Sequence, residues 1–563
     1  MNQRLYLAVV AILSSLSLAA CTSLPTSSSP SPFDVDAPNA QPVDLAAGGP
    51  VVDADPESLL SSFLLACAAG ASDDYATARL FLTSSSAQTW DPHKLVTIYS
   101  TDSTPKVSYS FDPSKTGTLN ASITATGVGS VDQNGVLSPA ETSSLEARFH
   151  LVRENGQWRI DAPADGVVVS QASFTASHEL VSLMFLSATG DSLIADPRWY
   201  PTRRVETHML EGLIAGPQSH LSDALVNAIP SGTSISAGGI ELSDHVAKVS
   251  LNGTLPSDDR GKQLMAWEIS QTLQRSGRVN SVEINVGGEV LPSSGLPSQP
   301  SFDLDSAVAF NSNGLVRIDG RSVSTRILPI APSSSASLPA VSPVSSSLLA
   351  WREDDRLILV DSSTNATRVV DGSEGQYSPS IDRFGWVWDI PRGGNLRASR
   401  IDGQNLPIAS ENQSLSGVSA VRISPDGARA LLLRQVGGST SAWIAGIERR
   451  GSGEPIALTD PEPLAGLSTG VDDVSWAGRS TVVAVRQGGL RVGNDQVDEV
   501  SLVTVPVGGF PSVLALPTGT QRLSAGSSSA TMVIRGKDGN YQVRSGALWQ
   551  SLEGNLRDVN FPG

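Results

Sequence analysis

The second half of the chain, residues 301–563, repeats a pattern of short apolar runs between turns rich in Gly, Ser and Asp. Three turn marks, about 50 residues apart, each precede a strand rich in Val, Leu or Trp: Ser378-Pro379-Ser380, Ser424-Pro425-Asp426-Gly427 and Val474-Ser475-Trp476. A period of about 40–50 residues with several strands is typical of propeller blades. We therefore predict an all-β propeller of about six blades over 301–563. A β-sandwich is the alternative, but it rarely needs about 260 residues.

The chain opens with an uncharged apolar run from Leu5 to Leu18, which follows Arg4 and ends at Leu18-Ala19-Ala20-Cys21. A short positive end, an apolar middle and small residues at the cleavage point are the layout of a secretory signal peptide. The run is shorter than the roughly 20 apolar residues of a membrane-spanning helix. We expect residues 1–20 to be removed. An ordinary secreted protein with a chance Cys near its cleavage point is the alternative.

The four residues at this cleavage point resemble the lipobox of bacterial lipoproteins. The resemblance implies that Cys21 receives an S-diacylglycerol and, at its new amino end, an N-acyl chain such as palmitate. Each buried methylene stabilises membrane binding by about 0.8 kcal/mol, and two or more chains hold a protein durably. We therefore expect a lipid anchor at Cys21 that holds the mature protein to the cell membrane, on the extracytoplasmic side.

Composition limits the partners of the chain. Residues 21–50 are rich in Pro and Ser without periodicity, which predicts a disordered tether. The net charge is −17 over 563 residues, and no dense basic run occurs, so no nucleic-acid partner is expected. Cys67 is the second of two cysteines. It has no intrachain partner once Cys21 is acylated, and we expect a buried structural thiol.

Residues 51–170 are predicted to form an α+β domain. Asp55-Pro56-Glu57 is a helix start signal, and apolar residues follow at helical spacing up to Cys67. A second helical stretch is expected over 73–81, followed by strands over 119–131, 145–153 and 157–160. Asn155-Gly156 predicts a type I′ hairpin. We expect Phe149 and Trp158 to pack on the helices, in an order that resembles the NTF2-like fold.

Residues 177–291 predict a second α+β domain, in which helices over 204–215 and 261–275 alternate with strands around Val249 and Ile284. Two stretches, 210–217 (LEGLIAGP) and 228–233 (AIPSGT), resemble the GerMN domain of spore-germination and sporulation proteins. That resemblance implies a binding module of the cell envelope without established catalytic residues. Residues 292–300 (PSSGLPSQP) are a predicted linker.

The sequence contains no clear set of catalytic residues. The propeller contains no histidine, and each of the six histidines stands alone, so we expect surface or capping roles for His93, His150, His178, His208, His220 and His245. No metal, cofactor or catalytic residue is predicted, and the chain is not expected to be an enzyme.

Three carboxylate clusters could supply a glycosidase pair, although turn and loop roles are favoured: Glu353-Asp354-Asp355, Asp472-Asp473 and Asp498-Glu499. Five propeller tryptophans are expected mostly in the core between blades: Trp386, Trp388, Trp443, Trp476 and Trp549.

The order of lipobox, NTF2-like block, GerMN block and propeller resembles the LpqB family of actinobacterial lipoproteins over essentially the whole chain. Three further stretches carry the likeness: 74–83 (DYATARLFLT), 89–92 (TWDP) and 196–201 (DPRWYP). The resemblance implies an accessory protein of the MtrA–MtrB two-component system. It would bind the extracytoplasmic domain of the sensor histidine kinase and serve cell-envelope homeostasis and division. Only the lipidated Cys21 carries over as a site.

Two functions therefore stand at this stage. The first is a non-enzymatic, membrane-anchored protein whose propeller and GerMN block bind the kinase sensor domain and modulate its signalling. The second is an envelope protein that binds or hydrolyses cell-wall glycan, for which Asp472 and Asp473 would be the residues to test. The poor supply of acid–base groups in the propeller favours the first.

Overall fold

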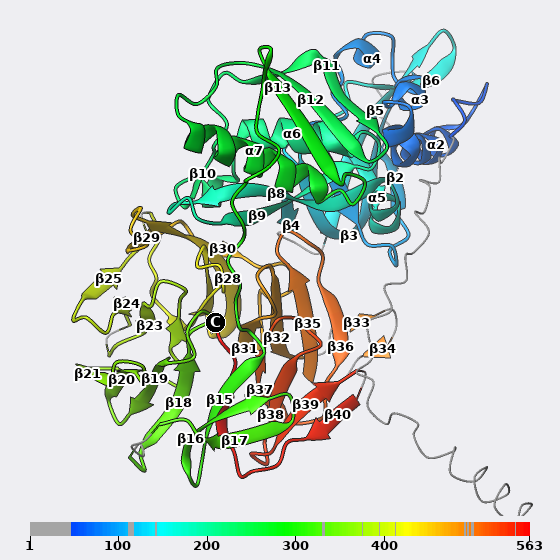
Figure 1. Ribbon diagram of the computed structural model, residues 1–563. Helices are drawn as coiled ribbons and strands as arrows, with labels where there is room; N and C mark the ends of the chain where they lie inside the picture. The colour runs from blue at the N-terminus through cyan, green and yellow to red at the C-terminus, as the bar shows by residue number, and fades with distance from the viewer. Residues whose placement is uncertain are drawn as a thin grey trace, which may run out of the picture. The chain divides into compact units, whose positions relative to one another are not determined.

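The computed structural model describes residues 47–563 apart from short internal gaps at 111–116, 141–143, 329–332, 374, 393, 411, 489–490, 493–494, 497–499 and 547. The predicted signal peptide, Cys21, nearly all of the tether and the Asp498-Glu499 cluster lie outside the described residues. Residues 44–563 form one compact unit. Figure 1 shows its elements with the labels used below.

The first part of this unit is a seven-stranded sheet with helix α2 packed against it. The sheet runs in the order β6-β5-β3-β1-β7, with β2 and β4 as additional partners of β3. Its pairs are antiparallel except β1 with β7, which are parallel. The elements are α2 (Pro56–Ala69), α3 (Ala76–Arg79), α4 (Ser86–Thr89), β1 (Leu95–Tyr99), β2 (Lys106–Ser110), β3 (Thr118–Asp132), β4 (Leu137–Pro139), β5 (Ser144–Glu154), β6 (Gln157–Asp161), β7 (Val167–Ser170) and α5 (Gln171–Ser177).

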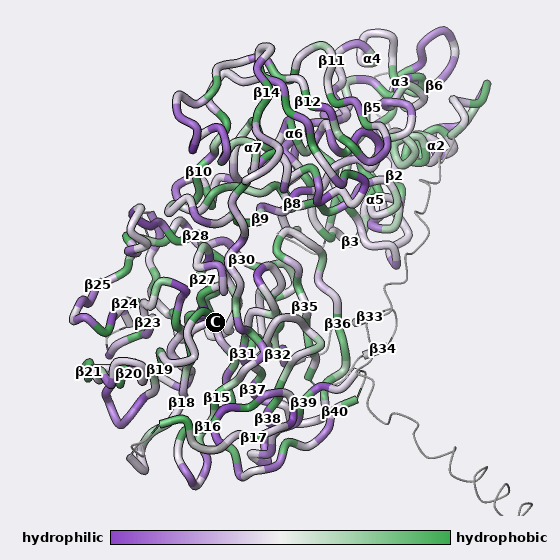
Figure 2. Tube along the Cα trace, in the orientation of Figure 1, coloured by the Kyte–Doolittle hydropathy of each residue, from purple (hydrophilic) through white to green (hydrophobic). Residues whose placement is uncertain are grey.

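Helix α2 begins where the sequence predicts. The carboxylate of Asp55 accepts hydrogen bonds from the backbone N–H groups of Glu57 and Ser58, and Pro56 is the first helical residue. The helix is mostly hydrophobic (Figure 2), and Phe63 and Cys67 are among its buried side chains. Cys67 is a free, buried cysteine, which confirms the predicted buried thiol, and burial raises its pKa.

Two local predictions for this part need correction. The stretch 73–81 was expected to be one helix, but only Ala76–Arg79 is helical, because Asp74 and Tyr75 adopt left-handed φ angles of 55° and 58° before it. Phe149 is buried as predicted, whereas Trp158 is only half-buried, with the Arg153 guanidinium 4.8 Å from its ring centroid.

The predicted turn between β5 and β6 is confirmed. Asn155 and Gly156 both have positive φ angles, 52° and 81°, which a type I′ turn requires.

The second part contains two sheets and two main helices. As predicted, a helix, α7, lies between two strands, β12 and β13. The two strands pair in parallel, and α7 packs on β13. The β8–β9 hairpin, which pairs with β10 in a separate sheet, was not predicted. The elements are β8 (His178–Ser187), β9 (Leu193–Pro201), α6 (Val205–Ala215), β10 (Leu225–Val226), β11 (Ser234–Ser243), β12 (Val246–Asn252), α7 (Asp259–Gln274), β13 (Ser281–Val286) and β14 (Glu289–Val290).

The third part is the predicted propeller, with six blades among the described residues. Blade 1 is completed by the last strand of the chain, because β41 pairs with β15. The blades are β15 (Ser306–Asn311), β16 (Gly314–Asp319), β17 (Ser322–Arg326) with β41 (Arg557–Asn560); β18 (Ala336–Val341), β19 (Leu348–Glu353), β20 (Arg356–Asp361), β21 (Ala366–Asp371); β22 (Ser380–Ile381), β23 (Val387–Asp389), β24 (Leu396–Ser399), β25 (Asn405–Ile408); β26 (Val418–Ile423), β27 (Arg429–Val436), β28 (Ser439–Arg449), β29 (Pro455–Leu458), β30 (Glu462–Pro463); β31 (Val471–Trp476), β32 (Thr481–Gln487), β35 (Val500–Pro506), β36 (Ser512–Ala515); and β37 (Thr520–Ala525), β38 (Met532–Gly536), β39 (Tyr541–Ser545), β40 (Leu548–Ser551).

The turn marks that revealed the period join neighbouring blades. Ser380 Oγ accepts a hydrogen bond from the N–H of Ile423, 2.9 Å away in the next blade, and Ser475 Oγ accepts one from Ala525 at 3.0 Å. The side chain of Asp426 holds its own Asp-Gly turn, as predicted, by accepting from the N–H of Ala428.

The tryptophans between the blades divide into two groups. Trp386, Trp388 and Trp476 are buried, and Trp443 is half-buried. Trp549 is half-buried against the core shared by blades 5 and 6. The prediction that most of these five rings fill the core is therefore confirmed.

Candidate functional site

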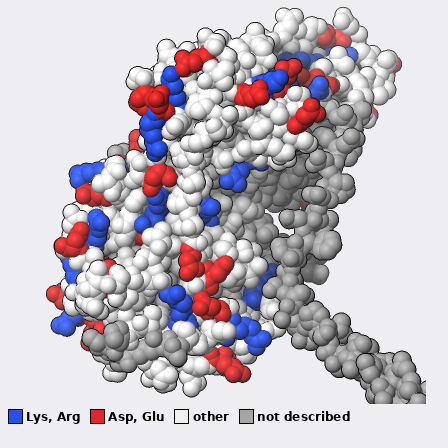
Figure 3. All heavy atoms as spheres, viewed as in Figure 1, with Lys and Arg blue, Asp and Glu red and all other residues white. Residues whose placement is uncertain are grey.

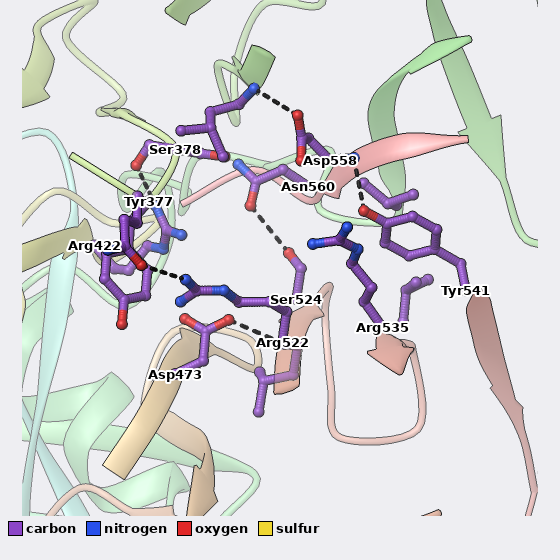
Figure 4. Close-up of a pocket in the computed structure, with 15 residues that line it drawn as sticks. Tyr377, Ser378, Arg422, Asp473, Arg522, Ser524, Arg535, Tyr541, Asp558 and Asn560 are labelled. Carbon is purple, nitrogen blue, oxygen red and sulfur yellow. Dashed lines mark hydrogen bonds between the residues drawn. The ribbon is translucent and has the colours of Figure 1, made fainter. Parts of the chain in front are cut away.

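The six blades surround a central channel, and the innermost strand of each blade lines it. These strands are β41, β18, β22, β26, β31 and β37, and each one contacts the next around the ring. Side chains from this ring meet in a pocket of about 110 Å³. Figure 4 shows the pocket, to which five of the six blades contribute charged or aromatic side chains.

One wall of the pocket is built around a buried carboxylate. Asp473 of β31 is 3% exposed, and its Oδ2 accepts a hydrogen bond from the N–H of Leu523 at 3.0 Å. Burial raises the pKa of Asp473, while the positive charges of Arg522 and Arg422 oppose that rise. The carboxyl group is therefore desolvated, and cations from two neighbouring blades lie beside it.

The two arginines of this wall are held by other groups. Nη1 of Arg422 donates to the carbonyl of Ser378 at 2.5 Å, and burial lowers the pKa of this guanidinium. The Arg522 guanidinium lies 4.2 Å from the ring centroid of Tyr377, a distance at which cation and aromatic face attract each other. Both cations are thus fixed at the channel surface.

The opposite wall comes from β38, β39 and the closing strand β41. Asp558 accepts from the N–H of Leu338 at 3.1 Å, and its own N–H donates to the Tyr541 hydroxyl at 2.7 Å. Asn560 Oδ1 accepts from Ser524 Oγ at 3.2 Å. Figure 4 places the Arg535 guanidinium between Asn560 and Tyr541, so this wall also presents a cation.

The structure describes two of the three predicted carboxylate clusters, and they lie in different surroundings. Asp354 and Asp355 lie in the β19–β20 turn, where Asp354 has a φ of 54°, so the expected turn role is confirmed there. Asp472 and Asp473 were expected between strands, but they lie within β31. Only Asp473 is buried in the channel, while the Asp472 carboxylate accepts a hydrogen bond from Gln487. The two carboxylates therefore have separate surroundings and do not share one site.

Two of the six histidines contradict the expected surface or capping role. His178 is buried and stacks on Phe174 with ring centroids 4.5 Å apart. The His220 side chain is 9% exposed and lies 3.5 Å from the Glu462 carboxylate. Burial lowers the pKa of each imidazole to about 4, so both rings are neutral at pH 7. Sequence reasoning missed this because isolated histidines carry no signal of burial.

Strand β9 connects the three parts of the unit. Arg198 forms a buried ion pair with Asp196 at 2.9 Å, and its Nη1 donates to the carbonyl of Asn134 in the first part at 2.9 Å. The indole N–H of Trp199 donates to the carbonyl of Gly508 in the propeller at 2.8 Å. One short strand thus makes polar contacts to the parts before and after it.

Further contacts bring the propeller against the same hairpin. Nη1 of Arg383 donates to Ser192 Oγ at 2.7 Å. Phe510 packs against Trp199 and Phe174, with centroids 5.3 and 6.0 Å apart. Because these contacts combine apolar packing with buried hydrogen bonds, they favour one fixed arrangement at the junction.

A groove of about 580 Å³ lies beside this junction, and all three parts line it. Its lining includes Asn134 from the first part, His220 from the second, and Glu462 and Gly508 from the propeller. Glu462 is half-exposed at 51%, and burial of its carboxyl group raises its pKa. The groove therefore exists only where the three parts meet.

The described part of the chain contains no group of three or more His, Cys, Asp or Glu side chains that could hold a metal ion. No helix in the same residues is long and apolar enough to cross a membrane. On the face shown in Figure 3, acidic and basic side chains are interspersed and form no continuous basic patch.

Three family models match the chain in succession. The N-terminal domain of lipoprotein LpqB matches residues 49–175, a sporulation and spore germination domain matches 182–292, and the LpqB beta-propeller domain matches 313–562. The chain belongs to the LpqB family. The stretch 196–201 that suggested this family is the part of β9 that forms the junction.

Relatives named lipoprotein LpqB match this chain over different shares of its length. Lipoprotein LpqB of Streptomyces coelicolor is 27% identical over 97% of this chain and 96% of its own length. The LpqB of Cutibacterium acnes is 32% identical over 52% of this chain and 47% of its own length, and that of Mycolicibacterium smegmatis is 27% identical over 83% and 84%. The family name identifies these relatives as lipoproteins.

Proposed function

We propose that the chain is a membrane-anchored, extracytoplasmic lipoprotein that binds a protein partner and is not an enzyme. The anchor is Cys21, triacylated after removal of residues 1–20. Support comes from the match of Leu18-Ala19-Ala20-Cys21 to a lipobox and from the lipoprotein name of the family. The mature domains would work near the membrane surface, at the reach of the tether 21–50.

The partner is the extracytoplasmic domain of a two-component sensor histidine kinase of the MtrA–MtrB type. Binding would bias the signalling state of that kinase, and so serve cell-envelope homeostasis and division. The observation that carries this proposal is the three-part junction at β9. Because Trp199 and Arg198 fix the parts against each other, the groove at the junction is a preformed surface.

The test is recovery of the kinase with the full-length lipoprotein from native membranes. We expect the kinase with the wild type and at least a fivefold smaller yield with Cys21→Ala, which removes the anchor. Glu462→Arg, which reverses a charge in the groove, should also reduce recovery. Asp371→Arg, an equally drastic change at an 87%-exposed carboxylate of blade 2, should not.

Two results would contradict the proposal. Failure to enrich any sensor kinase above an untagged control would remove the partner. Equal recovery with the wild type and Cys21→Ala would show that binding does not need the anchor.

A further inference from the structure

We propose that the propeller pocket binds a compact oxyanion, either a carboxylate or a phosphate group. Such a site lies in the channel, apart from the groove proposed for the kinase, and it does not depend on that proposal. Three features of the pocket support it: its charge, one donor without an acceptor among the described residues, and its size.

The pocket holds more positive than negative charge. Its lining contains the guanidinium groups of Arg422, Arg522 and Arg535 and the carboxylates of Asp473 and Asp558. Asp473 balances part of the charge of the first two arginines. Among the described residues, Arg535 forms no ion pair with either carboxylate, so one cation is left to be neutralised from the channel.

The side-chain amide of Asn560 supplies the unpartnered donor. The N–H of Phe561 donates to Ser524 Oγ at 2.9 Å, so the Ser524 hydroxyl is free to donate its own hydrogen to Asn560 Oδ1. This fixes the orientation of the amide and turns Nδ2 away from Ser524. Asn560 is 5% exposed, and Nδ2 has no hydrogen-bond partner among the described residues.

A buried N–H donor without an acceptor is costly, and a pocket ligand with an oxygen atom would remove that cost. Guanidinium groups favour carboxylate and phosphate oxygens because the planar fork can donate two parallel hydrogen bonds. Figure 4 shows Asn560 and Arg535 near each other at the pocket. Both can donate to the oxygen atoms of a ligand that enters the pocket.

The volume of about 110 Å³ limits what can enter. It suits a phosphate or a carboxylate with its first carbon atoms, and a longer ligand would have to extend along the channel. Asp473 disfavours anions near its own wall, so the oxyanion should lie toward Arg535 and Asn560. This wall is therefore where variants should act.

The test is titration of the full-length lipoprotein in detergent with inorganic phosphate and, separately, with acetate. Phosphate binding is followed by ³¹P line broadening and acetate binding by calorimetry. We expect one saturable site per chain for at least one anion. Arg535→Gln and Asn560→Asp should each weaken it about tenfold or more. Arg356→Gln, a matched change at an exposed arginine of blade 2, should alter it less than about twofold.

The comparison of the two anions identifies the group that the pocket prefers. Thermal unfolding of each variant confirms that it is folded before its affinity is compared. The proposal is overturned if neither anion binds saturably at up to about 100 mM, a concentration that fills a millimolar site. It is also overturned if Arg535→Gln and Asn560→Asp bind as the wild type does.

Discussion

Two buried aspartates of the same propeller lie in opposite kinds of site. Asp382, at the turn after β22, accepts from Arg449 Nη2 at 2.7 Å and from the indole N–H of Trp388 at 3.0 Å. Arg449 also donates to the carbonyls of Gly427 and Gly453, so every polar group of this pair has a partner. Asp473, by contrast, faces a channel in which the Nδ2 group of Asn560 has no acceptor among the described residues.

The difference separates a structural cluster from a candidate binding site. The Asp382–Arg449 pair joins blades 3 and 4 and is buried. Its polar atoms already have partners, so it offers no free group to a ligand. The channel cluster has similar residue types, but three arginines there face two carboxylates. Buried polar groups that are fully paired indicate architecture, whereas incomplete pairing in a cavity indicates a ligand.

The largest effect should come from breaking the closed pair. Asp382→Ala leaves the Arg449 guanidinium buried and uncompensated, and we expect the free energy of unfolding to fall by about 3–5 kcal/mol. Urea denaturation followed by tryptophan fluorescence measures this. Asp371→Ala, at an exposed ion pair with Arg356, should change it by less than about 0.5 kcal/mol. If both variants lose a similar free energy of unfolding, the buried pair is no more important to stability than the exposed one.

Glu268 of α7 is a third buried carboxylate, and its effect on stability can be tested by changing the pH. It accepts a hydrogen bond from the N–H of Ala228 at 2.8 Å, and burial raises its pKa to about 8. The folded chain therefore holds this proton more tightly than the unfolded chain, where the pKa is near 4.5. Between these values stability falls as pH rises, by about 1.4 kcal/mol per unit.

His178 and His220 change the stability in the opposite direction, and they do so at lower pH. Because the folded pKa values of His178 and His220 are about 4, stability is lost as pH falls from 6.5 toward 4. The window from pH 6.5 to 8 thus isolates Glu268, and we expect stability to drop there by about 2 kcal/mol. Urea midpoints across this window should be flat in Glu268→Gln. An unchanged slope in that variant would assign the effect elsewhere.

A smaller effect is expected where one blade holds the next. Ser380→Ala leaves the buried N–H of Ile423 without its acceptor, which should destabilise the chain by about 1–2 kcal/mol. Ser419→Ala, on the neighbouring β26, is the matched control. This residue is exposed and its hydroxyl only donates to the carbonyl of Leu433 at 3.2 Å, so its loss should cost less than about 0.5 kcal/mol. If both variants unfold at the same urea concentration, the contact between blades contributes nothing.

The smallest effect is expected for the pocket in the channel. Asp473→Asn keeps the acceptor for Leu523 N–H but removes one negative charge from the pocket. Inorganic phosphate should then bind more tightly, by about three- to tenfold, because less charge opposes it. The same ³¹P titration measures this gain. Weaker binding in Asp473→Asn would mean that the carboxylate takes part in recognition.

The parts of the fold that were predicted follow from local rules. The cap at Asp55, the turn at Asn155-Gly156 and the Asp-Gly turn at Asp426 depend on a few neighbouring residues. The blade period follows from repetition of such turns. Closure by β41 is different, because it pairs residues at the two ends of the propeller, and no local pattern marks it.

The pocket could not be predicted for the same reason. Arg422, Asp473, Arg522 and Asn560 come from four blades and meet only when the ring closes. One signal was present, since Arg422, Asp473 and Arg522 each interrupt a predominantly apolar or small-residue strand. Charged residues within the inner strands of three successive blades are a pattern that could have located the channel wall.

The proposed function depends above all on the lipid at Cys21. Mass spectrometry of the amino-terminal peptide, combined with membrane fractionation, tests it most directly. We expect a mature chain that begins at a Cys21 carrying a diacylglycerol thioether and an N-acyl chain, recovered with membranes. An unmodified Cys21 on a protein released into the medium would contradict it.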